Sequence, residues 1–421
     1  MIVKTSKLVE SYRQVREQTM EICKPLKTED YVVQPVVDVS PPKWHMAHTT
    51  WFFENFILKA HKKKYEVFDK DFAYLFNSYY EEEGERTLRP ERGFISRPGV
   101  EEIVRYREHV DHHMFELLDE LDEITEEFSY LMELGLNHEQ QHQELLVTDI
   151  KYILGHNPIF PVYKDFPEGE EVPKVNFKEN YLEFADGIYD IGHKEKSFCF
   201  DNERGAHNVY LHHYQVLDRL ISNDEYMEFM AAGGYSNFRY WLKEGWDWIQ
   251  ENKITAPMYW HRIDKEWYHY TLSGLRKVNP YVAVSHVSFY EAEAFARWKG
   301  KRLLTEFEWE NSCKKLRNEI PETSNFLEKG YFSPVPRVTE SFQFYGDVWE
   351  WTNSAYLPYP YYQKSDGALG EYNGKFMINQ MVLRGGSCAT PISHIRSTYR
   401  NFFHPNLRWQ FSGIRLAESI D

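Results

Sequence analysis

The chain has 421 residues, of which 42% are hydrophobic and 17% aromatic, enough material for two or three packed domains. Its formal net charge of −16 argues against general binding to nucleic-acid phosphates or to anionic membrane surfaces, because a negative protein field repels both. Only four cysteines occur, with no Cys-x-x-Cys pair, so the composition predicts neither a disulfide framework nor a thiolate zinc site. Small or cationic partners fit this composition better.

The N-terminal stretch carries charged residues every few positions instead of the apolar segment of a signal peptide. No uninterrupted apolar run of about 18 residues occurs along the chain. We therefore expect a protein that is neither exported nor membrane-spanning, and a reducing cytoplasmic location.

The segment 1–160 predicts a bundle of four long amphipathic helices. The first contains Tyr12, and the second is expected just after Pro42, since proline is tolerated in a first helical turn. A third helix follows Pro98, and a fourth ends near Gly155, a plausible C-terminal stop.

Over the segment 161–421 the pattern changes to short stretches rich in Gly, Trp, Tyr and Asn, and long helical periodicity is largely lost. One clear helix is expected in SFYEAEAFARWKGK, with Ser288 as its N-cap and Gly300 after its end. The sequence thus predicts an α+β protein, with a helical domain over 1–160 and a second domain over 161–421.

Two histidines of the predicted fourth helix, His138 and His142, are four residues apart and project from the face that should enter the bundle. His48 on the second helix can lie opposite them, whereas His45 is expected to point elsewhere and to be dispensable. Three imidazoles from two helices predict a metal site with open coordination positions. The alternative is that they are core histidines packed beside tryptophans.

The His-Glu-x-x-His spacing of 138–142 is also that of zinc peptidases, in which Glu139 would act as the general base. A metzincin needs Gly and His further along the helix, but Leu145 and Thr148 occupy those positions, so that class is excluded. Other zincins, with a distant glutamate as third ligand, remain open on spacing alone. Glu144 is expected to orient a ligand or to face solvent.

Longer motifs resemble a known enzyme family. WHMAHTTWFFENF, followed by LNHEQQHQELL, resembles the DinB-like bundle of the ergothioneine-pathway sulfoxide synthases, the EgtB family of non-haem iron enzymes. The stretches VSHVSFYEAEAFARWKGKRLLTEFEWE, GDVWEWTNSAYLPYP and RWQFSGIRLA resemble the formylglycine-generating-enzyme (sulfatase-modifying factor) domain, which has a C-type-lectin-like fold. The two resemblances, in this order, span nearly the whole chain and disfavour a peptidase.

Members of that family use iron(II) and O2 to join a thiol to the imidazole C2 of Nα-trimethylhistidine (hercynine), giving a sulfoxide. The resemblance implies this activity here, with cysteine favoured over γ-glutamylcysteine as the thiol and with no nucleic-acid or membrane partner. By motif, the iron ligands are His48, His138 and His142. The alternatives are a related enzyme that forms selenoneine or ovothiol, and a metal-binding protein without catalysis.

The resemblance also implies substrate contacts in the bundle. Gln141 matches the residue that hydrogen-bonds the substrate imidazole, with an amide satisfied inside the bundle as the alternative. Arg89 and Arg92 match the arginines that hold the carboxylate of the thiol, a task that suits a bidentate guanidinium, and Arg86 is the alternative partner. A solvated charge run that balances the neighbouring glutamates is the competing interpretation.

A tyrosine is expected to donate a proton during the oxidation, and the motif favours Tyr79 or Tyr80. In the second domain, Asn401, Phe402 and Phe403 match the family segment that lines the substrate pocket, and aromatic faces suit a trimethylammonium group. Other subgroups take the tyrosine from the C-terminal domain, where the candidates are Tyr356, Tyr359, Tyr361 and Tyr362.

Formylglycine-generating enzymes use a cysteine pair with copper, whereas this domain offers Cys388 in RGGSC with no second cysteine nearby. The resemblance therefore implies the fold of that domain and not its activity. Trp349 and Trp351 are expected to be structural.

Overall fold

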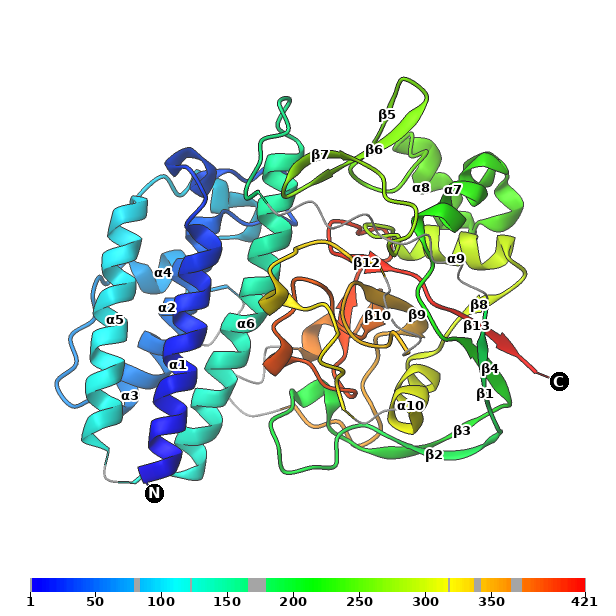
Figure 1. Ribbon diagram of the computed structural model, residues 1–421. Helices are drawn as coiled ribbons and strands as arrows, with labels where there is room; N and C mark the ends of the chain where they lie inside the picture. The colour runs from blue at the N-terminus through cyan, green and yellow to red at the C-terminus, as the bar shows by residue number, and fades with distance from the viewer. Residues whose placement is uncertain are drawn as a thin grey trace. The chain divides into compact units, whose positions relative to one another are not determined.

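The computed structural model describes residues 2–78, 84–121, 123–165, 179–316, 319–336, 342–364 and 373–420. It divides into two compact units: unit 1 holds the described residues up to Pro158, and unit 2 holds those from Ile159 onward. Unit 1 is helical, and unit 2 combines sheets with helices (Figure 1). The predicted α+β class is confirmed.

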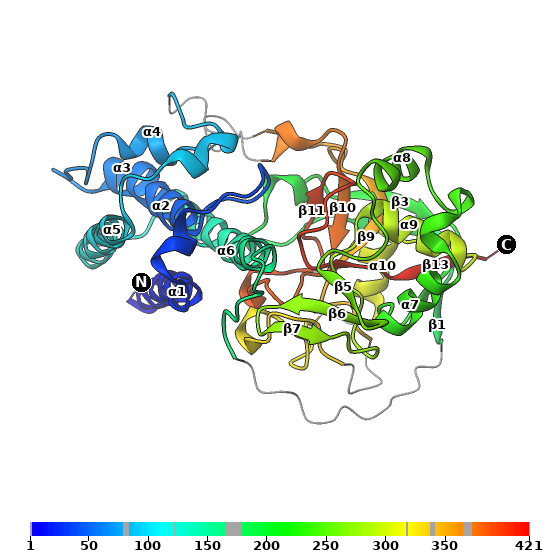
Figure 2. The same ribbon diagram turned by 90° about the horizontal axis from the view of Figure 1, so that it is seen from above.

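The described part of unit 1 is built from four long helices with shorter helical segments between them. Helix α1 packs against α6, and α2 packs against both α5 and α6; α1 and α5 are seen nearly end-on in Figure 2. The long helices are α1 (Ile2–Cys23), α2 (Pro42–Phe52), α5 (Val100–Glu120) and α6 (Glu126–Gly155). The short segments are α3 (Lys59–His61), α4 (Phe72–Phe76), the 3-10 helices Thr28–Val32 and Arg89–Phe94, and the π-helix Phe53–Leu58, which continues α2.

Local chemistry sets the helix boundaries and the approach of α6 to α2. Pro42 occupies the first turn of α2, where its missing N–H removes no intrahelical hydrogen bond. Thr125 caps α6, its Oγ1 accepting from the backbone N–H of Phe128 at 3.1 Å. At Gly135 an added Cβ would lie 2.8 Å from ring carbons of both Phe52 and Phe53. Glycine at this position lets the next turn of α6 lie close against α2.

A buried ion network fixes the rotation of α6. The carboxylate of Glu139 accepts hydrogen bonds from Arg16 Nη1 at 2.9 Å, from Thr19 Oγ1 at 2.6 Å and from Arg107 Nη2. Burial would raise the pKa of Glu139, but Arg107 and Arg16 outweigh burial and hold the pKa at about 2. Because Glu139 faces α1 and α5, its neighbour His138, about 100° away around the helix, is turned toward α2.

Unit 2 contains four sheets in the part of the chain that the structure describes. Two have four strands, in the orders β1-β4-β13-β8 and β11-β10-β9-β12, and the smaller sheets are β2-β3 and β5-β6-β7. The strands are β1 (Tyr181–Phe184), β2 (Gly187–Ile191), β3 (His207–Leu211), β4 (Tyr214–Leu217), β5 (Trp260–Ile263), β6 (Glu266–Thr271), β7 (Gly274–Lys277), β8 (Arg302–Leu303), β9 (Trp349–Ala355), β10 (Met381–Arg384), β11 (Asn401–Phe403), β12 (Ser412–Gly413) and β13 (Leu416–Ser419). The helices are α7 (Asn223–Ala231), α8 (Lys243–Glu251), α9 (Phe289–Trp298) and α10 (Glu306–Leu316).

The helix predicted in unit 2, α9, begins where the sequence placed it. Ser288 Oγ accepts from the backbone N–H of Glu291 at 3.2 Å, and the Glu291 carboxylate accepts from the backbone N–H of Ser288 at 2.8 Å. Gly300, just beyond the end of the helix, has a φ of 69°, which favours glycine. Trp349 and Trp351 of β9 are fully buried and pack as core residues.

A second buried ion network joins α10 to the central strands of unit 2. Glu306 accepts from Arg384 Nη2 at 2.9 Å and from Arg400 Nε at 2.8 Å. The hydroxyl of Tyr359 accepts from Arg384 at 2.8 Å and donates to Glu306 at 3.1 Å. All four side chains are buried. The network therefore fixes the chain directly before β11.

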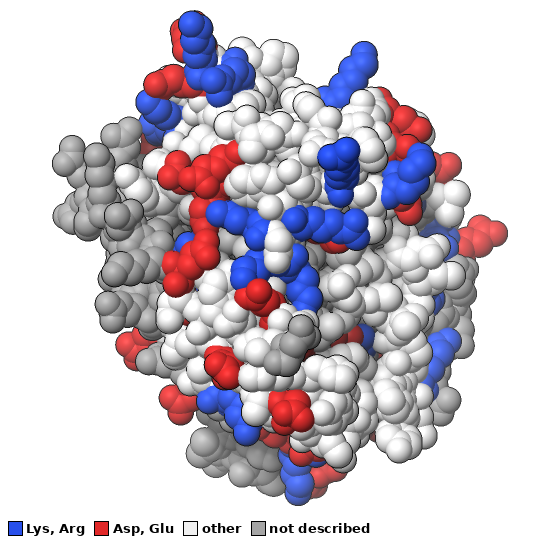
Figure 3. All heavy atoms as spheres, turned by 90° about the vertical axis from the view of Figure 1, so that its right-hand side faces the viewer, with Lys and Arg blue, Asp and Glu red and all other residues white. Residues whose placement is uncertain are grey.

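Three further properties concern the cysteines, the surface charges and the hydropathy of the helices. The four cysteines are buried and form no disulfide. Figure 3 shows acidic and basic side chains interspersed on one face of the molecule, separated by uncharged areas. Among the described helices, none combines the length and the hydropathy required to cross a bilayer.

Replacing Glu139 by Gln should lower the free energy of unfolding by about 3–5 kcal/mol, because the buried Arg107 loses the carboxylate that it binds and the buried Arg16 loses one of two, keeping Asp111. Urea unfolding followed by circular dichroism measures this change. Because the pKa of Glu139 is lowered by folding, its stabilising contribution should be fully present above about pH 4.5 and be lost as the pH falls toward 2.

The matched control is Glu133→Gln, on the exposed side of the same helix, which should change the unfolding free energy by less than about 0.5 kcal/mol. Similar small effects of the two substitutions would contradict the role given to the buried network.

Candidate metal centre

Three histidines from two helices converge in unit 1. His48 of α2 and His138 and His142 of α6 each offer one ring nitrogen, and these nitrogens all lie within 4.8 Å of one another. The Nε2 atoms of His48 and His138 are 3.2 Å apart. Two imidazole–metal bonds of about 2.1 Å enclosing an angle of about 100° span that distance, between the tetrahedral and octahedral values. The spacing therefore fits a single metal ion.

His48 is held in one orientation. Its ring lies between those of Trp44 and Trp51, at centroid distances of 4.5 and 5.7 Å and with both pairs inclined by 14°. Its Nδ1 lies 2.6 Å from the carbonyl oxygen of Phe76. Because a carbonyl oxygen only accepts, Nδ1 carries the proton, and Nε2, which faces His138, keeps its lone pair for a metal.

The three histidines are neutral at neutral pH. Burial lowers the pKa of His138 to about 4. Burial, followed by the neighbouring imidazoles, lowers the pKa values of His48 and His142 well below their usual range. Since histidine binds metals as the neutral imidazole, this donor set suits a divalent cation.

The glutamate of the His-Glu-x-x-His pattern cannot act as a peptidase base. Glu139 has no exposed surface and is held by Arg16, Thr19 and Arg107. Its low pKa makes it a poor proton acceptor at neutral pH. The spacing is shared with zinc peptidases, but the carboxylate serves the bundle and not the metal centre.

The expectation that His45 points elsewhere is wrong. Its Nδ1 lies 2.8 Å from Nδ1 of His142, and its Nε2 lies 2.9 Å from Oδ2 of Asp149. Residues three apart on a helix differ by about 60° in direction, so His45 shares a side of α2 with His48. Asp149, seven residues after His142, shares its face of α6, and this spacing was the signal that sequence reasoning missed.

Arg92 is separated from the histidine cluster by the ring of Trp44. Its guanidinium carbon is 3.4 Å from the centroid of the Trp44 ring, which itself stacks on His48. The guanidinium is buried and donates to Ser40 Oγ at 2.9 Å and to Ser78 Oγ at 2.8 Å. The structure thus places a fixed positive charge beside the cluster.

Arg89, the other predicted carboxylate-binding arginine, is half-buried. Its Nε and Nη2 donate to the backbone carbonyls of Val37 and Asp38 at 3.0 and 2.6 Å. These bonds tie the arginine loop to the segment that precedes α2. Tyr79 and Tyr80, the predicted proton donors, lie outside the described residues.

The remaining predicted substrate contacts are divided between the units. Gln141 is half-buried on α6, immediately before one of the cluster histidines. Asn401, Phe402 and Phe403 form β11 of unit 2, which pairs with β10. Phe402 stacks on Tyr356 with centroids 4.0 Å apart. The substrate roles of these residues stay predictions.

The C-terminal tyrosines considered as alternative proton donors have different environments in unit 2. Tyr356 is fully buried, and its hydroxyl accepts from Asn202 Nδ2 at 2.9 Å. Tyr359 belongs to the buried ion network around α10. Tyr361 is 81% exposed, and the Tyr362 hydroxyl donates to a neighbouring aspartate at 3.0 Å. The hydroxyls of Tyr356 and Tyr359 therefore serve the core of unit 2.

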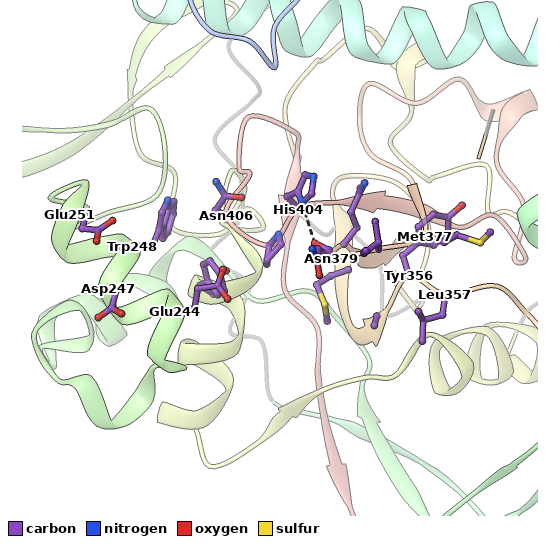
Figure 4. A pocket seen from close by; sticks show the side chains of 16 residues that line it. Glu244, Asp247, Trp248, Glu251, Tyr356, Leu357, Met377, Asn379, His404 and Asn406 are labelled. Atoms are coloured by element: carbon purple, nitrogen blue, oxygen red, sulfur yellow. Dashed lines mark hydrogen bonds between the residues drawn. The ribbon is translucent and has the colours of Figure 1, made fainter. Parts of the chain in front are cut away.

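A separate groove of about 1030 Å³ lies within unit 2 (Figure 4). Glu244, Asp247 and Glu251 of α8 line one wall, and Asp247 forms an ion pair with Lys243. Of the candidate site residues, only Tyr356 lines the described groove. The apolar residues Leu357, Met377, Ile378 and Met381 also line the groove, and Figure 4 shows Leu357 and Met377 opposite α8.

Comparison with known proteins identifies both halves of the chain. The family described as sulfatase-modifying factor enzyme 1-like domain matches residues 174–420, more than half of the chain. The chain belongs to this family. The DinB superfamily matches residues 11–146, which contain the three histidines. The two domains expected from the motifs are therefore present in the expected order.

Several relatives are similar to most of the chain. Hercynine oxygenase from Mycolicibacterium thermoresistibile is 29% identical over 332 residues, which are 72% of this chain and 72% of that protein. Hercynine oxygenase from Mycolicibacterium smegmatis is 29% identical over 72% of this chain and 75% of its own length. Ergothioneine biosynthesis protein 1 of Schizosaccharomyces pombe is 22% identical over 90% of this chain and 52% of its own length. The resemblance to the ergothioneine-pathway sulfoxide synthases is confirmed.

Replacing His138 or His142 by Ala should weaken Co(II) binding by more than about 100-fold, because a ligand atom itself is removed. Loss of a residue that only hydrogen-bonds a ligand typically costs roughly 10- to 100-fold. Titration of metal-free protein with Co(II), followed by visible absorption, gives the affinity. The control is His156→Ala, an exposed imidazole at the end of the same helix, which should bind Co(II) like the wild type. Equal affinities for all four proteins would rule out this centre.

Proposed function

We propose that this chain is an O2-dependent iron(II) sulfoxide synthase that joins a cysteine-type thiol to the imidazole C2 of hercynine. The observation that carries the proposal is the convergence of three neutral imidazoles on one point, in a chain similar over most of its length to proteins named hercynine oxygenase. Three protein ligands leave open coordination positions for substrates, as in other non-haem iron oxygenases. Iron(II), when bound there, supplies the redox chemistry by which O2 drives carbon–sulfur bond formation.

The residues around the cluster have distinct proposed tasks. Arg92 presents a buried positive charge that attracts the carboxylate of the thiol substrate and favours the ionised thiol. Gln141 hydrogen-bonds the substrate imidazole and so orients its C2 atom. Phe402 and Phe403 offer aromatic faces to the trimethylammonium group, and Asn401 offers an amide. Tyr79 or Tyr80 donates a proton during the oxidation.

The decisive experiment is anaerobic reconstitution of the full chain with Fe(II), followed by addition of O2, hercynine and one thiol at a time. Mass spectrometry of the products should show the hercynine–cysteine sulfoxide, with less product from γ-glutamylcysteine. In parallel reactions a selenium donor replaces the thiol, which tests selenoneine formation, and unmethylated histidine replaces hercynine, which tests ovothiol formation. Metal uptake without product in any reaction would support the non-catalytic alternative.

Replacing Arg92 by Ala should raise the KM for the thiol by roughly 10- to 150-fold, since a charge-assisted hydrogen bond to a carboxylate is worth about 1.5–3 kcal/mol. The KM for hercynine should change far less. Arg89→Ala should have a smaller effect, because Arg89 is only half-buried and solvent screens its charge more than that of the buried Arg92. Steady-state kinetics with each substrate varied in turn gives both constants.

The control for charge alone is Arg105→Ala, an exposed arginine of α5, which should leave both KM values unchanged. Equal increases for thiol and hercynine in Arg92→Ala would show that the residue only supports the fold of the loop.

Replacing Tyr79 or Tyr80 by Phe should leave metal binding and folding intact but divert turnover toward oxidation of the thiol alone. Phenylalanine keeps the ring and loses the proton donor, so less sulfoxide should form per O2 consumed. An oxygen electrode combined with product quantification measures this ratio. An unchanged ratio in both single variants and in the double variant would transfer the role to Tyr361 or Tyr362, whose hydroxyls lie outside the buried ion network.

A further inference from the structure

We propose that His45 and Asp149 are positioning residues that determine which nitrogen of His142 faces the metal. The inference rests on the proposed metal centre and adds two residues that take no part in ligation themselves. Both side chains are almost fully buried, His45 at 2% and Asp149 at 1% exposure. They form a chain of contacts from Asp149 through His45 to His142, with distances of 2.9 and 2.8 Å.

The direction of each hydrogen bond follows from the chemistry of the carboxylate. Asp149 Oδ2 also accepts from the backbone N–H of Ser40 at 2.8 Å, which holds the carboxylate in place as an acceptor. His45 Nε2 must then carry the proton and donate to Asp149. A neutral imidazole has one N–H, so His45 Nδ1 is an acceptor and His142 Nδ1 must donate to it. That assignment leaves the lone pair of His142 on Nε2.

Each contact pairs one turn of α2 with one turn of α6. His48 meets His138, and His45 meets His142, so the residue order on the two helices runs in opposite directions. His48 and His142 are both held through Nδ1, the first by the carbonyl oxygen of Phe76 and the second by His45. Both therefore keep Nε2 for a shared ion, as expected of ligands fixed by outer hydrogen bonds.

The alternative is that His45 and Asp149 only fill space between the helices. A set of three variants separates positioning from packing. His45→Gln keeps an acceptor for His142 and a donor for Asp149 in one amide group, whereas His45→Leu keeps volume and removes both. Asp149→Asn is isosteric and its amide oxygen can take the place of Oδ2, but it removes the negative charge that favours the proton on His45 Nε2. The variant therefore weakens the preference that leaves the lone pair of His142 on Nε2.

The experiment measures Co(II) affinity and the visible spectrum of the Co(II) protein for the full chain and the three variants, with urea unfolding of each metal-free protein alongside. We expect His45→Leu and Asp149→Asn to bind Co(II) about 10- to 100-fold more weakly than the wild type, with altered band intensities. His45→Gln should restore affinity and spectrum nearly to wild-type values. Affinities are compared among variants whose metal-free unfolding matches the wild type.

Wild-type affinity in both His45→Leu and Asp149→Asn would overturn the inference, and so would a His45→Gln protein as weak as His45→Leu. If His138→Ala bound Co(II) as tightly as the wild type, the proposed metal centre itself would be wrong. The two failures are therefore distinguishable in one set of titrations, without any assay of turnover.

Discussion

The carboxylate of Glu139 is the constraint on which the histidine cluster depends. It joins three helices, because Arg16 lies on α1, Arg107 on α5 and Glu139 on α6. Two cations and one anion are buried together, and removal of the anion takes from Arg107 the carboxylate that it binds and leaves Arg16 with Asp111. With that side of α6 committed, His138 and His142 have one direction left, toward α2. The orientation of the two histidines is therefore set by contacts on the opposite side of α6.

Two buried carboxylates of α6 have tasks that differ from the general-base task of the glutamate in a zinc peptidase. Glu139 anchors the helix, and Asp149 acts on a ligand through His45. The same five-letter pattern can therefore accompany different chemistry, because its function depends on what surrounds the glutamate and not on the spacing of the histidines. Its buried arginine partners distinguish this bundle from a peptidase site more directly than the motif does.

Much of the fold could be predicted because local rules dominate it. Pro42 in a first turn and the Ser288 cap with its glutamate three residues on are readable from sequence. The shared direction of His138 and His142 was readable as well, because residues four apart share a helix face. The partners of Glu139 were not, since Arg16 and Arg107 are remote in sequence. The direction of the His45 side chain was misjudged because a three-residue offset was taken for a different face.

The predicted substrate contacts came from the family resemblance and not from residue patterns. The structure gives the surroundings of some of these residues in more detail than those of others. Arg92 lies beside the cluster through Trp44, a relation that no spacing rule predicts because it depends on the path of a loop. Gln141 precedes His142 on α6, and its predicted substrate contact comes from the resemblance alone. The β11 residues Asn401 to Phe403 belong to a different unit, so their contribution rests on the family comparison.

The hydrogen bond from His48 to the carbonyl oxygen of Phe76 connects the cluster to another part of the chain. Phe76 ends α4, and two residues later Ser78 accepts from Arg92. Tyr79 follows directly in the sequence. The imidazole of His48 therefore offers one nitrogen to the proposed ion and holds the backbone of Phe76 with the other. Replacement of His48 would remove both a proposed metal ligand and the hydrogen bond to Phe76. Replacement of His138 would therefore be the more specific test of metal ligation.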